Sequence, residues 1–280
     1  MRSVRPGAPG WDIARPSRPG RLPGVRMAGF SDQTTGLASV RVVPHPAVMV
    51  VIDIGGGLVI DDASGWPQQS SVAAGLAPVG AAGRGPQPFE CLQVRLSPVV
   101  APAVLGACAE LSGAVVALED LWGREAVRIQ ERLRATASWP DRFAIAEAIL
   151  ARRQETSRAA DPEVAFAWGK LVASRGRIRV ERLAAEAGWS RKRLWARFRS
   201  QIGLTPKRAA RLVRFDYAAR LLAEGHRAAE VAAGTGYADQ SHLHRDAQAF
   251  AGMTPAAMAA TPFLAVDDVA WPDALSATSR

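Results

Sequence analysis

The chain has 280 residues, a net charge of +9, 48% hydrophobic residues and a mean hydropathy of −0.01. These values describe a globular chain long enough for two domains and exclude one that is disordered overall. The apolar runs are shorter than the ~18 residues of a membrane span, and two cysteines, Cys91 and Cys108, cannot form a disulfide framework or a four-cysteine zinc site. We therefore expect a cytoplasmic protein without a membrane segment, metal or other cofactor.

The first predicted segment, 1–26, is rich in Arg, Pro and Gly and lacks apolar periodicity, which predicts a disordered tail. Met27 is a second candidate, beside Met1, for the start of translation. An α+β domain is predicted over 27–156. Its short β-like runs lie between about 40 and 98, separated by Gly and Pro, and helical periodicity follows over 101–153. This order predicts a small sheet with helices packed beside it.

A polar linker at 157–163 separates this domain from a basic block at 164–263, which a C-terminal tail at 264–280 follows. Residues 164–262 contain 17 Lys and Arg against 7 Asp and Glu, whereas the rest of the chain has 18 against 19. A local basic block is typical of a protein that binds a phosphate backbone, although an anionic membrane surface or an acidic protein would also attract it.

An internal repeat lies within the basic block. Residues 183–189 reappear in character at 231–237, and Gly-Leu-Thr-Pro at 203–206 reappears as Gly-Met-Thr-Pro at 252–255. Each copy predicts a short helix, a tight turn that ends in glycine, and a second helix with a polar N-cap. The block therefore predicts an all-α domain with two helix-turn-helix motifs.

The second helix of each copy carries the candidate contact residues. In the first copy Leu194, Phe198 and Ile202 recur at helical spacing and face the core. The outward positions of this helix are cationic with one aromatic: Arg191, Lys192, Arg193, Trp195, Arg197 and Arg199. In the second copy the outward residues are Gln240, Ser241, His244 and Arg245. These residue types are typical of helices that read base edges in the major groove.

Pro206 begins a connecting helix that is predicted to run to about Ala223, a rod of roughly 26 Å. Such a rod would hold the two outward helices apart for successive major-groove segments ~34 Å apart. Its cationic residues Lys207, Arg208 and Arg211 are expected to contact phosphates.

The basic block resembles the DNA-binding region of AraC/XylS transcription regulators from Val164 to about Phe263. The resemblance is carried by Gly188-Trp189-Ser190, by the run Gly236 to His242, and by Gly252-Met253-Thr254-Pro255. It implies a seven-helix domain whose third and sixth helices read DNA, joined to an N-terminal domain for effector sensing or dimerisation. Promoter or operator DNA is thus the expected partner, with a small-molecule effector, RNA polymerase and a homodimer as further partners.

Carried over by position, the family's base-facing sites fall on Lys192, Trp195, Ala196 and Arg199 in the first motif and on Gln240, Ser241, His244 and Arg245 in the second. The chain departs from the family at Trp195 and Ala196, where polar or basic residues are frequent. It also has Ala247 in place of a usual core Phe, and Asp246 is expected to add a negative charge beside the groove.

Other interpretations compete with these. Trp189 and Tyr237 are expected to pack in the core, whereas Trp195 either packs against a neighbouring helix or contacts DNA. His242 and His244 do not share a helix face, which disfavours a metal site. The expected function is a nucleoid-associated transcription regulator and not an enzyme. The alternatives are a DNA-repair alkyltransferase with Cys91 or Cys108 as nucleophile, or a nonspecific nucleoid-type DNA binder driven by charge.

Overall fold

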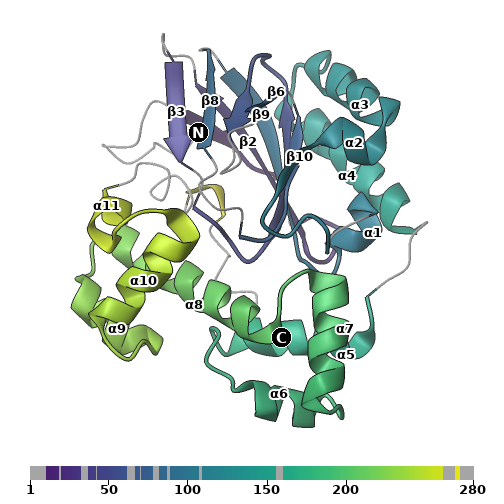
Figure 1. Ribbon diagram of the computed structural model, residues 1–280. Coiled ribbons are helices and arrows are strands. Elements are labelled where there is room, and N and C mark those ends of the chain that lie inside the picture. The colour runs from purple at the N-terminus through teal and green to yellow at the C-terminus, as the bar shows by residue number, and fades with distance from the viewer. Residues whose placement is uncertain are drawn as a thin grey trace.

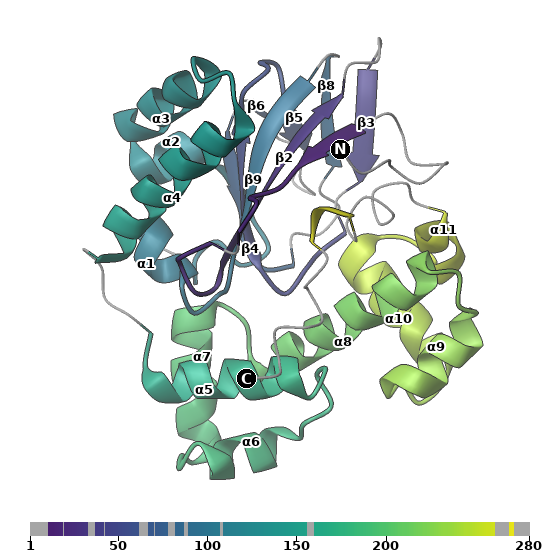
Figure 2. The same cartoon turned by 180° about the vertical axis from the view of Figure 1, so that it is seen from behind.

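The computed structural model describes residues 11–18, 20–32, 37–41, 43–61, 67–69, 71–77, 82–86, 89–106, 109–155, 160–260 and 269–271. Two antiparallel sheets and a group of helices form the N-terminal half, and a purely helical half follows (Figures 1 and 2). None of the helices in these ranges is both long and apolar enough to cross a membrane.

The larger sheet has its strands in the order β1-β2-β9-β4-β7-β10. The strands are β1 (Trp11–Ala14), β2 (Val25–Asp32), β9 (Phe89–Leu96), β4 (Val48–Asp53), β7 (Val72–Ala74) and β10 (Val115–Ala117). Strands β2, β9 and β4 are buried along almost their whole length. Of these three strands only β4 is a nearly continuous apolar run, whereas β9 also carries Gln93 and Arg95, which are buried because both faces of the sheet are covered.

The smaller sheet has the order β3-β8-β5-β6 and packs against one face of the larger sheet. Its strands are β3 (Leu37–Arg41), β8 (Ala82–Pro86), β5 (Val59–Asp61) and β6 (Pro67–Gln69). An apolar cluster that includes Phe30, Val51 and Ile60 lies between the sheets.

Helices cover the opposite face of the larger sheet (Figure 1). They are α1 (Ala101–Leu105), α2 (Leu118–Trp122), α3 (Arg124–Arg134) and α4 (Trp139–Glu155). The Trp139 ring packs so closely on β2 that a Cβ atom at Gly29 would lie 2.3 Å from it, so only glycine fits there.

The helical half consists, over residues 160–260, of seven helices. They are α5 (Pro162–Ala173), α6 (Val180–Glu186), α7 (Arg191–Ile202), α8 (Pro206–Ala223), α9 (Ala228–Thr235), α10 (Gln240–Ala251) and α11 (Pro255–Ala259). The predicted fold class, an α+β half followed by a seven-helix half, is confirmed.

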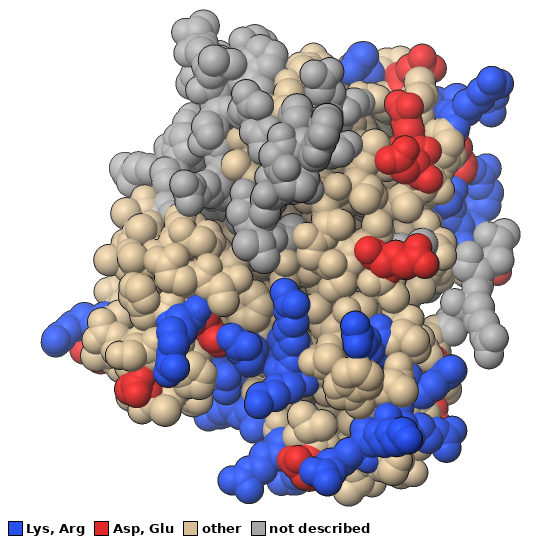
Figure 3. All heavy atoms as spheres, viewed as in Figure 1, with Lys and Arg blue, Asp and Glu red and all other residues tan. Residues whose placement is uncertain are grey.

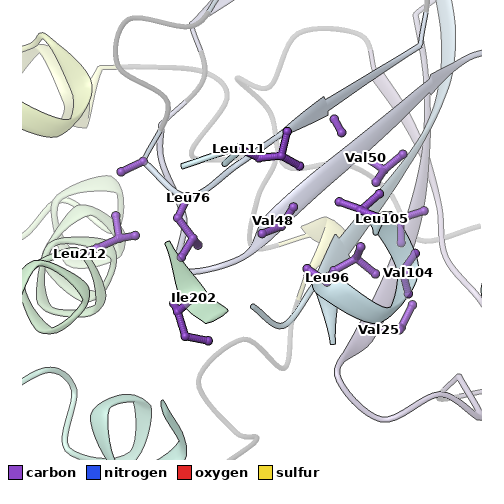
Figure 4. Close-up of a cluster of buried hydrophobic side chains, with 14 of the residues drawn as sticks. Val25, Val48, Val50, Leu76, Leu96, Val104, Leu105, Leu111, Ile202 and Leu212 are labelled. Carbon is purple, nitrogen blue, oxygen red and sulfur yellow. The ribbon is translucent and has the colours of Figure 1, made fainter. Parts of the chain in front are cut away.

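The two halves share one apolar core. Leu76 and Leu111 of the N-terminal half belong to the same buried cluster as Ile202 and Leu212 of the helical half (Figure 4). The backbone approach is also close, because a Cβ atom at Gly203 would lie 2.9 Å from the carbonyl oxygen of Ala109. The basic block is therefore packed against the N-terminal half as well as linked to it.

The prediction of disorder over 1–26 is wrong for its described part. Residues 11–14 form β1, which pairs with β2 along its full length, and β2 begins at Val25, inside the predicted tail. A short edge strand is stabilised by backbone hydrogen bonds to its neighbour, so an Arg- and Pro-rich composition does not prevent it. Residues 1–10 lie outside the described ranges.

Two other boundaries also differ from the prediction. The helical half begins with α5 at Pro162, within the predicted linker 157–163, whose residues 157–159 lie outside the described ranges. The predicted tail 264–280 includes Ala270 and Trp271, which are 3% exposed and pack in the cluster between the sheets. The packing of these two residues depends on contacts with strands more than 170 residues earlier in the sequence, and no local sequence pattern predicts such contacts.

Candidate nucleic-acid interface

The first helix-turn-helix motif is formed by α6 and α7. Gly188 has a φ of +68° in the turn between them, and the Ser190 hydroxyl caps α7 by accepting a hydrogen bond from the Arg193 amide at 3.2 Å. Leu194, Phe198 and Ile202 are fully buried, as their spacing predicts. The opposite face of α7 is thereby left to solvent.

That outward face combines positive charge with one large ring. Arg191, Lys192, Ala196 and Arg199 are exposed, and Trp195 is 46% exposed. The Arg199 guanidinium lies 5.2 Å from the centre of the Trp195 ring. Of the two interpretations of Trp195, packing against a neighbouring helix does not account for this exposure.

Two cationic residues of α7 also contact neighbouring side chains. Arg193 is exposed, and its guanidinium lies 4.7 Å from the centre of the half-buried Trp189 ring. Arg197 donates to the carboxylate of Asp161, with a shortest distance of 2.6 Å. Asp161 precedes α5, so this ion pair fixes the start of the helical half to the first motif.

The second motif, α9 and α10, repeats the same construction. Gly236 ends α9 with a φ of +83°, and Asp239 caps α10 by accepting from the His242 amide at 2.6 Å. Leu243 and Ala247 are fully buried. The outward residues Gln240, Ser241, His244 and Arg245 are all exposed and together line one open hollow in the surface.

Asp246 corrects one expectation from the sequence. It is only 1% exposed and accepts from the Arg211 guanidinium of α8 at 2.6 Å. Its charge is therefore paired inside the protein and does not lie beside a groove. Arg211 in turn joins α8 to α10, whereas Lys207 and Arg208 at the first turn of α8 are exposed.

The buried Tyr237 ring packs in the core of the second motif. It is 5% exposed, in the cluster that includes Leu222 and Val231, as expected for a core residue. Burial, together with the nearby negative charge of Asp246, raises the pKa of the Tyr237 hydroxyl. The ring stays neutral, and the His242 ring packs edge-on against it with centroids 5.0 Å apart.

α8 places the two motifs at opposite ends of one helix (Figure 1). It begins at Pro206 after the cap Thr205, whose hydroxyl accepts from the Arg208 amide at 3.2 Å. In Figure 3, Lys and Arg side chains gather over the helical half of the face on which α7 and α10 are visible in Figure 1. The basic surface in this view therefore belongs to the half of the molecule that carries both motifs.

Residues 183–261 match a protein-family model described as a helix-turn-helix domain. The match begins in α6 and spans both motifs and α8. Residues 183–261 are an AraC-type helix-turn-helix domain. The predicted family resemblance is thereby confirmed for this part of the chain.

Solved structures similar to the chain include ToxT from Vibrio cholerae O395, at 10% identity and a TM-score of 0.48, covering 86% of this chain and 98% of ToxT. The C-terminal domain of AraT, a response regulator from Geobacillus stearothermophilus, has 22% identity and a TM-score of 0.34, covering 37% of this chain and 87% of that one. The AraC-like transcriptional activator CuxR has 14% identity and a TM-score of 0.26, covering 74% and 86%. No curated protein matches the chain.

A buried hydrogen bond attaches the AraC-type domain to the N-terminal half, and no sequence signal pointed to it. His45 Nδ1 lies 2.7 Å from Asp216 Oδ1, and the other carboxylate oxygen accepts from Arg220 Nε at 3.2 Å. All three residues are less than 10% exposed. Burial opposes ionisation of Asp216, but the Arg220 charge and the His45 hydrogen bond outweigh it and hold the pKa of Asp216 well below its usual range.

The thiol of Cys91 is poorly suited to the alkyltransferase alternative. Cys91 lies on β9 between the two sheets and is 2% exposed. Burial, reinforced by the negative charge of Asp53, raises the pKa of this thiol to about 12, which opposes the nucleophilic thiolate form. Cys108 lies outside the described ranges. Among the described residues, no cluster of His, Cys, Asp or Glu could hold a metal ion.

Proposed function

We propose that this chain is a sequence-specific transcription regulator that inserts α7 and α10 into two successive major-groove segments of promoter DNA. One observation carries the proposal: two capped helix-turn-helix motifs stand at the ends of a single helix and leave the outward residues of α7 and α10 exposed in the basic half of the molecule. Exposed second helices of such motifs are the elements that enter the major groove.

The length of α8 supports reading by one chain. Its 18 residues correspond to a rod of about 27 Å. With α7 and α10 packed at its ends, their contact faces suit groove segments one helical turn, ~34 Å, apart. The operator should therefore contain two short boxes with centres about 10–10.5 base pairs apart.

The exposed side chains suggest which residues contact bases and which contact phosphates. Arg199 and Arg245 can each donate two hydrogen bonds to guanine, and Gln240 can pair with adenine. Trp195 and Ala196 offer apolar surface to thymine methyl groups. The remaining base-facing candidates are Lys192, Ser241 and His244, and Arg191, Arg193, Lys207 and Arg208 surround them as candidate phosphate contacts.

The N-terminal half is assigned the regulatory role. Residues 11–155 contain 14 Lys and Arg against 14 Asp and Glu, so this half has no net charge that would attract DNA at long range. Its shared core with α7 and α8 provides a mechanical connection to the motifs. We place any effector response and homodimer contact there, and a contact with RNA polymerase and a cytoplasmic, nucleoid-associated location follow from the same function.

Selection of bound duplexes from a random pool, followed by titration at fixed salt, tests this proposal. The full chain should recover two boxes and prefer them to bulk DNA by roughly 10³ or more. Arg199→Ala should relax the sequence of one box and Arg245→Ala that of the other. Arg182→Ala is the matched control, because Arg182 is exposed on α6 and paired with Glu186 at 2.7 Å.

Two results would overturn the proposal. Equal affinity for selected and bulk DNA would indicate the nonspecific nucleoid-type binder, which depends on charge alone. A single selected box that only the Arg199 substitution alters would mean that α10 does not read bases.

A further inference from the structure

Three arginines gather between the two helix-turn-helix motifs, at positions that the proposed contacts with DNA do not use. Arg175 and Arg177 belong to the loop between α5 and α6, and Arg214 is the ninth of the 18 residues of α8. Among the described residues, none of the three is paired with a carboxylate, whereas their neighbours Arg211 and Arg220 are paired with aspartates. We call these three residues the central arginine group.

The loop between α5 and α6 crosses the middle of α8. A Cβ atom at Gly176 would lie 2.1 Å from the Ala210 carbonyl oxygen and 3.0 Å from the Arg214 amide nitrogen, so the loop backbone touches the helix. Arg175 precedes this glycine and has a φ of +52°, in the left-handed region where glycine is usual. Non-glycine residues in that conformation cluster at functional sites, which makes the Arg175 side chain a candidate for binding.

Two tyrosine rings position two of these guanidinium groups. Arg175 Nη1 donates to the Tyr217 hydroxyl oxygen at 2.6 Å, and its guanidinium carbon lies 4.2 Å from the centre of that ring. The Arg214 guanidinium carbon lies 4.7 Å from the centre of the Tyr237 ring. Packing on an aromatic ring positions a cation without neutralising it, so both charges can still attract an anion.

Arg177 connects the group to the second motif. It is exposed, and a Cβ atom at Gly236 would lie 3.3 Å from its Cδ. Gly236 is three residues before Asp239, the cap of α10, a separation of at most ~11 Å along the chain. The N-terminal residues of a recognition helix are the ones that contact base edges, so Arg177 lies close to the second groove segment when α10 is inserted.

DNA offers phosphates at the matching place. Two major-groove segments one turn apart on one face of the duplex are separated by a minor groove, which the phosphates of both strands border. The middle of α8 is equally far along the helix from both motifs, so it corresponds to that minor groove when α7 and α10 are inserted. In homeodomains, a three-helix variant of the motif, the loop between the first two helices contacts the DNA backbone.

We propose that Arg175, Arg177 and Arg214 form a third DNA contact, which binds the phosphates that border the minor groove between the two boxes. This contact depends on phosphate charge and carries no base preference. It links the motifs, because Arg177 lies against the turn of the second motif while its loop leads into α6 of the first. The inference rests on the proposed function.

Neutral linkages in the operator test the contact. In a duplex with both selected boxes, methylphosphonates replace the phosphates that border the minor groove between them. At fixed salt the full chain should bind this duplex about threefold or more weakly than the unmodified operator, because contacts with charged phosphates are lost. A chain with Arg177→Gln and Arg214→Gln should bind both duplexes alike. The control Arg182→Gln, at the exposed residue paired with Glu186, should lose as much as the original chain.

Salt dependence gives a second measure. One phosphate contact contributes about 0.9 to the slope of log affinity against log salt, so from about 50 to 200 mM salt the original chain should lose about threefold more affinity than a chain without that contact. Arg175→Gln and Arg177→Gln should each show this difference, and both replace exposed residues. Circular dichroism and the melting temperature show whether each chain is folded. If Arg214→Gln unfolds the double variant, Arg177→Gln alone takes its place in both titrations.

The results separate this contact from the proposed function. Neutral linkages that weaken the original chain and the arginine variants alike would mean that other residues bind these phosphates. Linkages that weaken neither would mean that the phosphates are not bound. A lower melting temperature with an unchanged salt slope would assign the central arginine group to packing between the motifs. Each of these results overturns the third contact and leaves the two boxes intact, whereas failure to select any box overturns the proposed function and the contact together.

Discussion

Asp216 provides a measurable test of how firmly the AraC-type domain is attached to the N-terminal half. Its carboxylate lies between His45 and Arg220, and all three residues are buried. Asp216→Ala removes the anion from two buried partners, and breaking a buried pair in this way costs about 3–5 kcal/mol of unfolding free energy. His45→Ala removes one hydrogen bond to a charged group, for which about 1.5–3 kcal/mol is expected.

The assay is urea unfolding at pH 7, followed by circular dichroism. Glu224→Gln is the control, because Glu224 follows α8 at the surface, 3.5 Å from an exposed His226 side chain, and such pairs contribute about 0–1 kcal/mol. If Asp216→Ala unfolds at the same urea concentration as the control, the buried pair is not present in the protein in solution.

The pH dependence gives the pair a second signature. The pKa of Asp216 is lowered in the folded protein, so its contribution to stability is fully present above the unfolded value of ~3.9 and is lost as the pH falls towards the folded value. Asp216→Asn cannot ionise and lacks this contribution. The stability gap between the original chain and Asp216→Asn should therefore shrink as the pH falls below 4. A gap that widens in acid would contradict the lowered pKa.

Further substitutions test the interface and the packing beneath it. Arg245→Ala should weaken operator binding by about 1–3 kcal/mol and relax preference at one base position, which titration of base-substituted operators measures. Arg208→Ala should instead weaken all DNA alike and reduce the salt slope by about 1, and a base-dependent loss would contradict a phosphate contact. Gly203→Ala should lower the melting temperature, because Gly203 has a φ of +85° and a Cβ atom there would meet the Ala109 carbonyl oxygen at 2.9 Å. An unchanged melting temperature would mean that the two halves are not in contact at this point.

The helix-turn-helix region could be predicted because its signals are local. Pro206 and Ala223 bound α8 as predicted, and the caps Ser190 and Asp239 mark the starts of α7 and α10. A cap bonds to an amide three residues away, so the sequence around it contains both partners. The outward residues of both helices follow in the same way, because helical spacing from each cap separates them from the buried stripe.

The position of Asp246 was also accessible from the sequence, although it was predicted wrongly. It follows Leu243 by three residues and precedes Phe250 by four, so helical spacing places it on the buried stripe. A carboxylate on a buried stripe needs a cationic partner, and Arg211 on the connecting helix supplies it. Charge alone had suggested a surface position, but periodicity was the stronger signal.

Only the fold class of the N-terminal half could be predicted, because the order of strands in a sheet depends on pairing between strands that are far apart in the sequence. β9 lies between β2 and β4, and nothing in the sequence of Phe89–Leu96 indicates with which strands it pairs. The hydrogen bond between His45 and Asp216 spans 171 positions. A single sequence carries no signal for contacts over such distances. The same limit concealed the docking of Trp271 on β2 and β9.

α8 has two structural roles at once, and this combination is the physical basis for regulation in the molecule. It sets the separation of α7 and α10, and it also carries Leu212 and Asp216, which contact the N-terminal half. A change of packing in that half therefore acts directly on the helix that spaces the two motifs. The N-terminal half also packs at the end of α7, where a Cβ atom at Gly203 would lie 2.9 Å from the Ala109 carbonyl oxygen, whereas α10 is joined to α8 by the pair of Asp246 and Arg211. The two motifs can thus differ in how far they are free to adjust to DNA, although they share one repeat.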